Sequence, residues 1–152
     1  MSEQTSFTVN LAQQQDYQFK VKFDWDEAGD LLVDTGPPVG QSKGPDSERL
    51  LATAVGYCLT ASLLFSMRKF KQNPGRLRTE VTGSLTRNER GRLRVGGLAA
   101  TIRLSDQADH IAHLDRATQQ FEDFCTVTES IRDGIPVRVQ VVDAAGRMIH
   151  GG

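Results

Sequence analysis

Residues 44–67 read GPDSERLLATAVGYCLTASLLFSM and predict one long buried helix. The Gly-Pro pair is a turn signal, and the Asp-Ser-Glu group behind it is suited to the first turn of a helix. No charge occurs from Leu50 to Met67, and basic residues follow before the Asn73-Pro74-Gly75 stop. The pattern predicts a helix of about six turns over about 47–72. Because this helix is apolar on nearly all sides, we expect other elements to cover it.

The overall composition is that of an ordinary soluble domain. The chain has 152 residues, of which 38% are hydrophobic and 24% charged, so a single domain with a real core is expected. The uncharged run is long enough for a membrane span to be weighed. No second apolar segment exists, and the run itself is interrupted by Thr53, Gly56, Thr60, Ser62 and Ser66. We therefore expect no membrane partner and, since the N-terminus lacks a basic start and an apolar stretch, a cytoplasmic location.

The formal net charge of −1 conceals an uneven distribution. Residues 1–48 hold nine acids against three lysines, whereas residues 68–94 hold nine bases against two acids. A basic hairpin is compatible with nucleic acid, but this one has no aromatic residue on which bases could stack. We favour a solvated face, or a surface that meets the acidic N-terminal third, and expect no nucleic-acid partner.

Alternating apolar residues predict strands on both sides of the long helix. Before it, we expect short strands within residues 6–34, the strongest from Tyr17 to Phe23 with one wet face. After it, residues 76–104 predict a β-hairpin that turns at Asn88–Gly91. The apolar phase of the second hairpin strand changes at Gly96-Gly97, which predicts a β-bulge.

The C-terminal third predicts helices over residues 106–133 and a last strand over 135–143. Asp106 is the expected cap of the first of these helices, and a short further helix covers 126–132. The apolar stripe of the first helix is Ile111, Leu114, Thr118, Phe121 and Cys125. The whole chain, 1–152, is thus expected to form one α+β domain around the central helix.

The chain has two cysteines, Cys58 and Cys125, and they are its only sulfur nucleophiles. The simplest interpretation makes both of them small buried hydrophobic residues. The alternative is a redox role, because structural disulfides are rare in a reducing compartment. Cys125 lies between two predicted helices, where N-terminal amides can lower a thiol pKa. Cys58, in the middle of a helix, would need a cation or a pocket to become reactive.

Other kinds of site have weak support. His110 and His113 are three residues apart and could share a metal, but the nearby Asp106 and Asp109 favour an exposed, charge-balanced helical turn. The further ligands of a closed metal site are not apparent. The sequence also lacks the glycine-rich phosphate loops and the nucleophile-elbow motif. We expect no metal and no cofactor.

Two motifs give the chain a resemblance to the OsmC/Ohr family. The long helix is entered through Gly-Pro-x-x-Glu-x-Leu-Leu-Ala and carries a cysteine near its centre, and a second cysteine lies in FCTVTESI, residues 124–131. With the closing strand VRVQV, the resemblance covers most of residues 17–143. It implies an OsmC-like fold, with antiparallel sheets wrapped around the central helix in an intertwined homodimer.

The resemblance also implies an activity: a thiol peroxidase that reduces organic or lipid hydroperoxides in oxidative-stress defence. Cys58 would be the peroxidatic thiol and Cys125 the resolving thiol, and Glu48 matches the glutamate that holds the family's activating arginine. The Cys58–Cys125 disulfide would be reduced by an external dithiol, for which a lipoyl-type dithiol is one candidate.

One position departs from the family pattern, because no arginine occurs before Arg49. Lys20, Lys22, Lys43 or Arg49 would have to replace the activating arginine, and lysine lacks its bidentate fork. The alternative is therefore a binding protein on the same fold, with an apolar ligand and structural or redox-sensing cysteines. Glu48 and Cys58 are also separated by roughly 15 Å along one helix, so an antiparallel pair of helices from two chains would be needed to bring them together.

Overall fold

The computed structural model describes residues 6–152 and divides into two compact units, the first ending at Leu50 and the second comprising Leu51–Gly152. The elements in chain order are β1 (Val9–Gln15), β2 (Gln18–Phe23), β3 (Leu31–Val33), α1 (Ser47–Lys69), β4 (Arg78–Arg87), β5 (Leu93–Arg103), η1 (Ala108–His110), α2 (Leu114–Gln120), η2 (Phe121–Phe124), α3 (Thr126–Ile131), β6 (Val137–Val142) and β7 (Met148–Gly151). This α+β order confirms the fold class predicted from the sequence.

The first unit is a three-stranded antiparallel sheet in the order β1-β2-β3, followed by the loop that leads to α1. Strand β1 continues through Gln15, and Gln13 and Gln15 pair with Phe19 and Gln18 of β2. The buried carboxylate of Asp34 organises the loop by accepting hydrogen bonds from the backbone N–H groups of Thr35, Gln41 and Lys43. These bonds, that of Lys43 foremost, lower the pKa of Asp34.

Helix α1 begins where the sequence predicts, and it ends slightly earlier than 72. Asp46 caps it, since the Arg49 N–H donates to Asp46 Oδ1 at 3.0 Å. After Lys69 the chain leaves the helix in a turn in which the Gln72 N–H bonds to the Met67 carbonyl, and Lys71 adopts a positive φ of 60°. The Asn-Pro-Gly segment then leads into the sheet of the second unit.

The second unit is a four-stranded sheet in the order β4-β5-β6-β7, in which only β5 and β6 run parallel. The predicted bulge is present: Ser84 pairs with Gly97 and Leu85 with Val95, so Gly96 is the extra residue. A Cβ at Gly96 would lie 2.5 Å from the Thr86 side chain, which favours glycine there.

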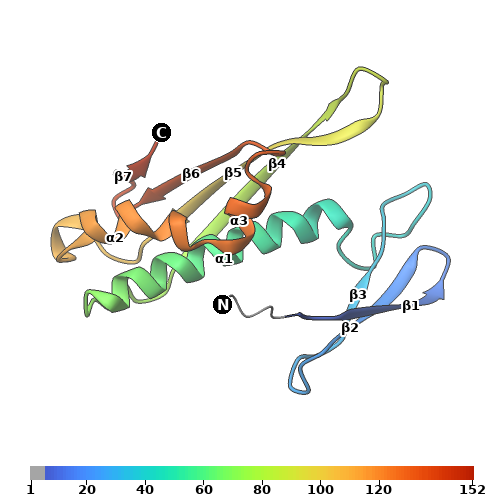
Figure 1. The fold of residues 1–152 in the computed structure, drawn as a ribbon, viewed down its shortest axis with the longest axis horizontal. Helices are drawn as coiled ribbons and strands as arrows, with labels where there is room; N and C mark the ends of the chain where they lie inside the picture. Colours follow the sequence, from blue (N-terminus) through green and yellow to red (C-terminus); the bar gives the residue numbers. More distant parts are fainter. Residues whose placement is uncertain (1–5) are drawn as a thin grey trace. The chain divides into compact units, whose positions relative to one another are not determined.

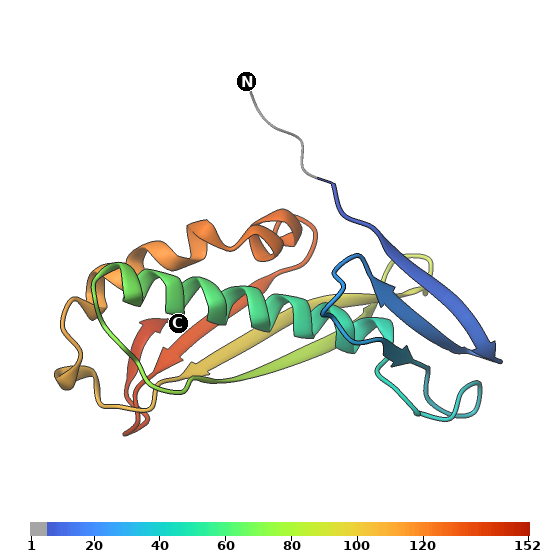
Figure 2. The same ribbon diagram turned by 90° about the horizontal axis from the view of Figure 1, so that it is seen from below.

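One face of this sheet is covered by α1 and by the α2–α3 segment, which lie on the same side of the strands (Figures 1 and 2). The core is formed by alternate residues of β5 and β6 packed against one stripe of α1, namely Leu98, Ala100, Ile102, Val137, Val139, Val141, Val55, Leu59, Leu63 and Met67. Ser66 on α1 donates to the Ala117 carbonyl of α2 at 3.0 Å, which fixes the two helices side by side.

The sequence led us to expect that other elements cover helix α1 on all sides. Its own chain leaves one face of the helix exposed. Tyr57 and Phe65 are 75% and 63% exposed, whereas Leu59 and Leu63 on the other face are fully buried. Among residues 6–152, α1 is also the one helix long and apolar enough to cross a membrane. Its buried stripe packs on the sheet as that of a core helix does.

One C-terminal prediction is wrong in detail, and one strand was not predicted. The chain after Asp106 is not a continuous helix: a 3₁₀ turn at Ala108–His110 is followed by His113 in the left-handed region, and α2 starts only at Leu114. The Asp143 carboxylate accepts the Ala108 N–H at 3.0 Å and so holds this segment to the β6–β7 turn. The short strand β7, which the sequence did not predict, pairs antiparallel with β6.

Candidate functional site

Cys58 lies in the middle of α1 at the border between its buried and exposed faces. Its side chain is half-buried, and its neighbours Val55 and Leu59 are fully buried. Two residues before it, Gly56 lets the helix approach β4 closely: a Cβ at Gly56 would lie 2.7 Å from Val81 Cγ2. The small residue Gly56 therefore lets α1 pack closely on β4.

Cys125 lies at the junction of η2 and α3 and is fully buried. Its N–H donates to the Glu122 carbonyl at 3.0 Å and its carbonyl accepts the Glu129 N–H at 3.0 Å, so its backbone both closes η2 and opens α3. Its thiol donates to Thr128 Oγ1 at 2.9 Å, and Thr128 is itself fully buried. The Cys125 side chain is thus fixed in one orientation.

The structure brings the two cysteines together. Cys58 packs against the buried cluster that contains Cys125, and both are free thiols. Burial, and after it the contact with Cys58, raises the pKa of Cys125 from 9.0 to about 11. The hydroxyl and N–H of Thr128 act in the opposite direction but are outweighed. The expectation that helix amides would lower this pKa is therefore wrong, because desolvation dominates.

Glu48, the third predicted site residue, is not brought to the two cysteines by the helix that carries it. It lies in the first turn of α1, where its carboxylate accepts a hydrogen bond from Ser47 Oγ at 3.0 Å. It precedes Cys58 by ten residues on one continuous helix, which corresponds to roughly 15 Å along the axis. In the described part of a single chain, no basic side chain forms an ion pair with Glu48.

Sequence reasoning missed Thr128 and a polar cluster beside it in the chain. Glu122, in η2, bridges Arg132 at 2.9 Å and His150 of β7 at 2.5 Å. The His150 ring also packs edge-on against Phe121 with centroids 5.1 Å apart. Thr128 could have been found, because it follows Cys125 by three residues at the start of a predicted helix. His150 carried no signal, because its strand was not predicted.

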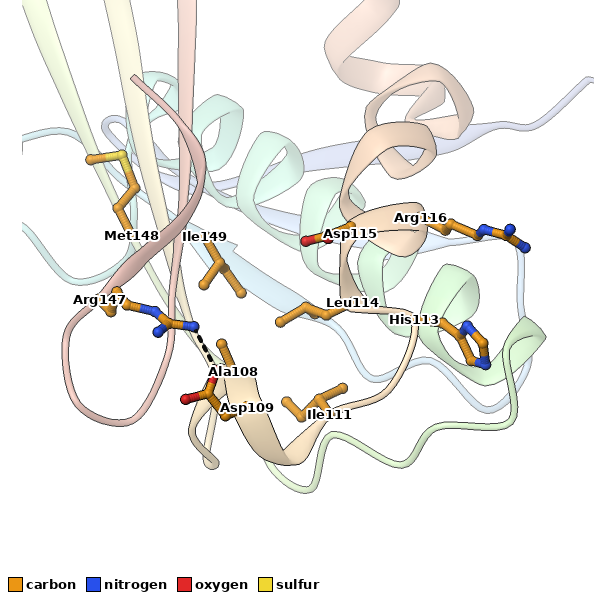
Figure 3. Close-up of a pocket in the computed structure, with 10 residues that line it drawn as sticks. All are labelled: Ala108, Asp109, Ile111, His113, Leu114, Asp115, Arg116, Arg147, Met148 and Ile149. Carbon is orange, nitrogen blue, oxygen red and sulfur yellow. Dashed lines mark hydrogen bonds and ion pairs between the residues drawn. The ribbon is translucent and has the colours of Figure 1, made fainter.

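The pocket drawn in Figure 3 lies away from the cysteines. It has a volume of about 610 Å³ and is lined by residues of η1, α2 and β7, with the ion pair between Asp109 and Arg147, 3.1 Å, on one side. His113 and Arg116 lie on the other side of the view (Figure 3). His110, the other histidine of the predicted metal alternative, pairs with Asp106 at 2.8 Å. No group of three potential metal ligands exists among residues 6–152.

Comparison with known proteins supports the same fold. An OsmC-like protein of unknown function from Vibrio cholerae superposes with a TM-score of 0.76 at 13% identity, covering 91% of this chain and all of that one. The organic hydroperoxide resistance protein OhrB of Bacillus subtilis gives a TM-score of 0.66 at 16% identity, covering 90% and 98%. The organic hydroperoxide resistance protein OsmC of Legionella pneumophila gives 0.66 at 15% identity, covering 92% and 98%.

The sequence comparisons assign the family. No functionally curated protein matches the chain significantly. The family model for OsmC-like proteins matches residues 40–140, which contain the whole of α1 and both cysteines. The chain is therefore a member of the OsmC-like protein family.

Proposed function

We propose that the protein is a cysteine-dependent peroxidase that reduces organic hydroperoxides. The observation that carries this proposal is that Cys58 packs against the buried cluster that contains Cys125 and helps to raise the pKa of Cys125. Structural neighbours named organic hydroperoxide resistance proteins support the reaction class. The apolar surroundings of Cys58 favour an alkyl or lipid hydroperoxide over hydrogen peroxide, and its half-buried position leaves it accessible.

The first step oxidises Cys58. Its thiolate attacks the O–O bond of the hydroperoxide, an S–O bond forms, and the O–O bond breaks. Cys58 becomes a sulfenic acid, and the leaving alkoxide takes a proton from solvent to become the alcohol. Cys58 is the better candidate for attack because Cys125 is fully buried and its pKa is raised.

The second step closes the disulfide between Cys58 and Cys125. Cys125 loses its proton to solvent, its thiolate attacks the Cys58 sulfenic acid, an S–S bond forms and the S–O bond breaks, and the leaving hydroxide takes a proton from solvent to become water. An external dithiol then reduces the disulfide by exchange and is itself oxidised to a disulfide. Such a reductant is available in the cytoplasm, where we place the activity.

A homodimer is part of the proposal. Two separate surfaces expose apolar side chains: the outer face of α1, with Tyr57 and Phe65, and one face of the β1–β2 pair, with Val9, Leu11 and Phe23. A second copy of the chain would bury such surfaces and could present its Glu48 toward Cys58. Light scattering of the purified protein tests the dimer, and a monomer at micromolar concentration would contradict it.

The peroxidase proposal is tested by measuring consumption of cumene hydroperoxide with dihydrolipoamide as reductant. We expect turnover by the wild type, none by Cys58→Ser, and a single oxidation of Cys58 without turnover by Cys125→Ser. Intact-mass spectrometry after stoichiometric peroxide should show an intramolecular disulfide in the wild type only. Equal, negligible consumption by the wild type and Cys58→Ser would reject the activity.

A second candidate is a binding protein on the same fold, and the absence of arginine from residues 1–48 favours it. Without that guanidinium the thiolate lacks the family's usual partner, and the space near Cys58 would hold an apolar metabolite instead. Native mass spectrometry of the purified protein would then show a co-purified ligand. Rapid Cys58–Cys125 disulfide formation with stoichiometric peroxide would argue against this alternative.

A further inference from the structure

Three arginines line one pocket at the end of the four-stranded sheet. Arg78 begins β4, Arg76 lies two residues before it, and Arg103 ends β5. The β6–β7 turn, Asp143–Gly146, forms part of the wall. The pocket has a volume of about 580 Å³, within the range of small-molecule sites. We call it the arginine pocket. Neither cysteine lines it.

Within residues 6–152, none of the three arginines forms an ion pair with an acidic side chain. Arg78 and Arg103 are directly opposite each other on the antiparallel strands β4 and β5, an arrangement that is destabilising for like charges. The ion pairs of the second unit are formed by other basic side chains, those of His110, Arg132, Arg147 and His150. Glu80 follows Arg78 by two residues on the same face of β4 and pairs with none of the three arginines within residues 6–152.

The one acidic residue that lines the arginine pocket is engaged elsewhere. Asp143 is buried, and its carboxylate accepts the backbone N–H groups of Ala108, Ala145 and Arg147 at 3.0, 3.0 and 2.8 Å. It therefore shapes the turn that walls the pocket and leaves the three guanidinium groups uncompensated. Arg76, Arg78 and Arg103 are exposed to solvent, so together they form a positively charged surface that a bound anion would stabilise.

We propose that the arginine pocket binds a small molecule that carries a phosphate group. A phosphate has several oxygens and about two negative charges, so it can accept bidentate hydrogen bonds from more than one guanidinium group. A carboxylate has two oxygens and one charge, which a single guanidinium group pairs with. A nucleic acid is disfavoured because no aromatic side chain lines the pocket for base stacking. The phosphate could belong to a soluble molecule or to a lipid headgroup, and the experiment separates these sources.

The test uses inorganic pyrophosphate as the probe and calorimetric titration of the full-length protein at low ionic strength. We expect saturable binding by the wild type and binding about tenfold or more weaker in Arg78→Gln and in Arg103→Gln. Arg90→Gln is the matched control, because Arg90 lies in the hairpin turn at the other end of β4 and loses the same charge. Its affinity should equal that of the wild type.

Thermal unfolding checks the same variants for folding. Pyrophosphate should raise the melting temperature of the wild type and Arg90→Gln but not of Arg78→Gln. Without pyrophosphate, Arg78→Gln should be at least as stable as the wild type, because it removes the opposed pair. A less stable Arg78→Gln would show that the arginine is structural and would overturn the proposal.

Vesicles distinguish the two sources of phosphate. Retention on phosphatidylglycerol vesicles that pyrophosphate competes away would assign the site to lipid headgroups, and pyrophosphate binding without retention would assign it to soluble phosphorylated molecules. No saturable pyrophosphate binding, or an equal loss of affinity in Arg90→Gln, would show a diffuse basic field and refute the site. Retention on DNA at low salt that Arg90→Gln weakens as much as Arg78→Gln does would also refute the site.

Discussion

The raised pKa of Cys125 predicts a steep pH dependence for the step that forms the disulfide. With a pKa of about 11, roughly one Cys125 in 10⁴ is a thiolate at pH 7. When Cys58 is a sulfenic acid, its contribution to the shift is lost, but burial, the larger cause, remains. The apparent pKa should then fall between 9.0 and about 11. The rate of condensation should therefore rise about tenfold per pH unit from pH ~7 to ~9.

The assay must isolate the second step from the first. At high concentrations of cumene hydroperoxide the oxidation of Cys58 is fast, and the rate of disulfide formation reaches a plateau that no longer depends on peroxide. Acid quenching at set times followed by intact-mass spectrometry then separates the sulfenic acid from the disulfide. The pH dependence of the first step is measured separately in Cys125→Ser.

Thr128 supplies the internal control for this prediction. Its hydroxyl and N–H lower the pKa of Cys125, so Thr128→Val should slow condensation about two- to tenfold at fixed pH, whereas Thr128→Ser should not. A plateau rate that is flat between pH ~7 and ~9 would refute the reasoning. It would mean that Cys125 is already ionised and that the helix amides, rather than burial, control its pKa.

Two further predictions concern stability. Gly56→Ala should destabilise the fold by about 1 kcal/mol, because the strain of placing a Cβ 2.7 Å from Val81 Cγ2 exceeds the gain in helix propensity. Urea unfolding should show a smaller loss of stability when the substitution is made in Val81→Ala. An equal loss in both backgrounds would contradict this contact. Asp143 has a pKa lowered from 3.8, mainly by the Ala108 N–H, so its stabilising effect is present above the unfolded value and is lost as the pH falls through the lower folded value. At pH values below ~4, the melting temperature of the wild type should therefore decrease. The melting temperature of Asp143→Asn should be lower at neutral pH and should change less with pH. Parallel plots of melting temperature against pH for the two proteins would exclude this role.

The two cysteines show how far the sequence determines a site of this kind. The identities of Cys58 and Cys125 were evident from the chain, and the structure packs Cys58 against the buried cluster that contains Cys125. The state of Cys125 was not evident, because a helix N-terminus and a buried core shift a thiol pKa in opposite directions. Sequence position reveals the first influence, and only the packing around Cys125 reveals that the second is larger.

The segment after Asp106 shows a different limit. Its apolar residues recur at helical spacing, and four of the five predicted stripe residues, Leu114, Thr118, Phe121 and Cys125, are buried. The spacing thus predicted the buried side chains correctly, although the backbone does not form one continuous helix. Contacts with distant residues cause the departure: Asp143, 35 residues away, takes the Ala108 N–H that a regular helix would leave to a local cap.

Helix α1 explains why the composition of a run cannot assign its faces. Its residues that approach other elements most closely are small: Gly56 lies against Val81, and Ser66 bonds to α2. Its large aromatic residues, Tyr57 and Phe65, are exposed. Cys58 lies on the border between these faces, where a thiol can touch buried Cys125 on one side and remain open to a substrate on the other. A fully buried position would exclude the hydroperoxide, and a fully exposed one would lose the resolving thiol, so the border position of Cys58 is a condition of the proposed chemistry.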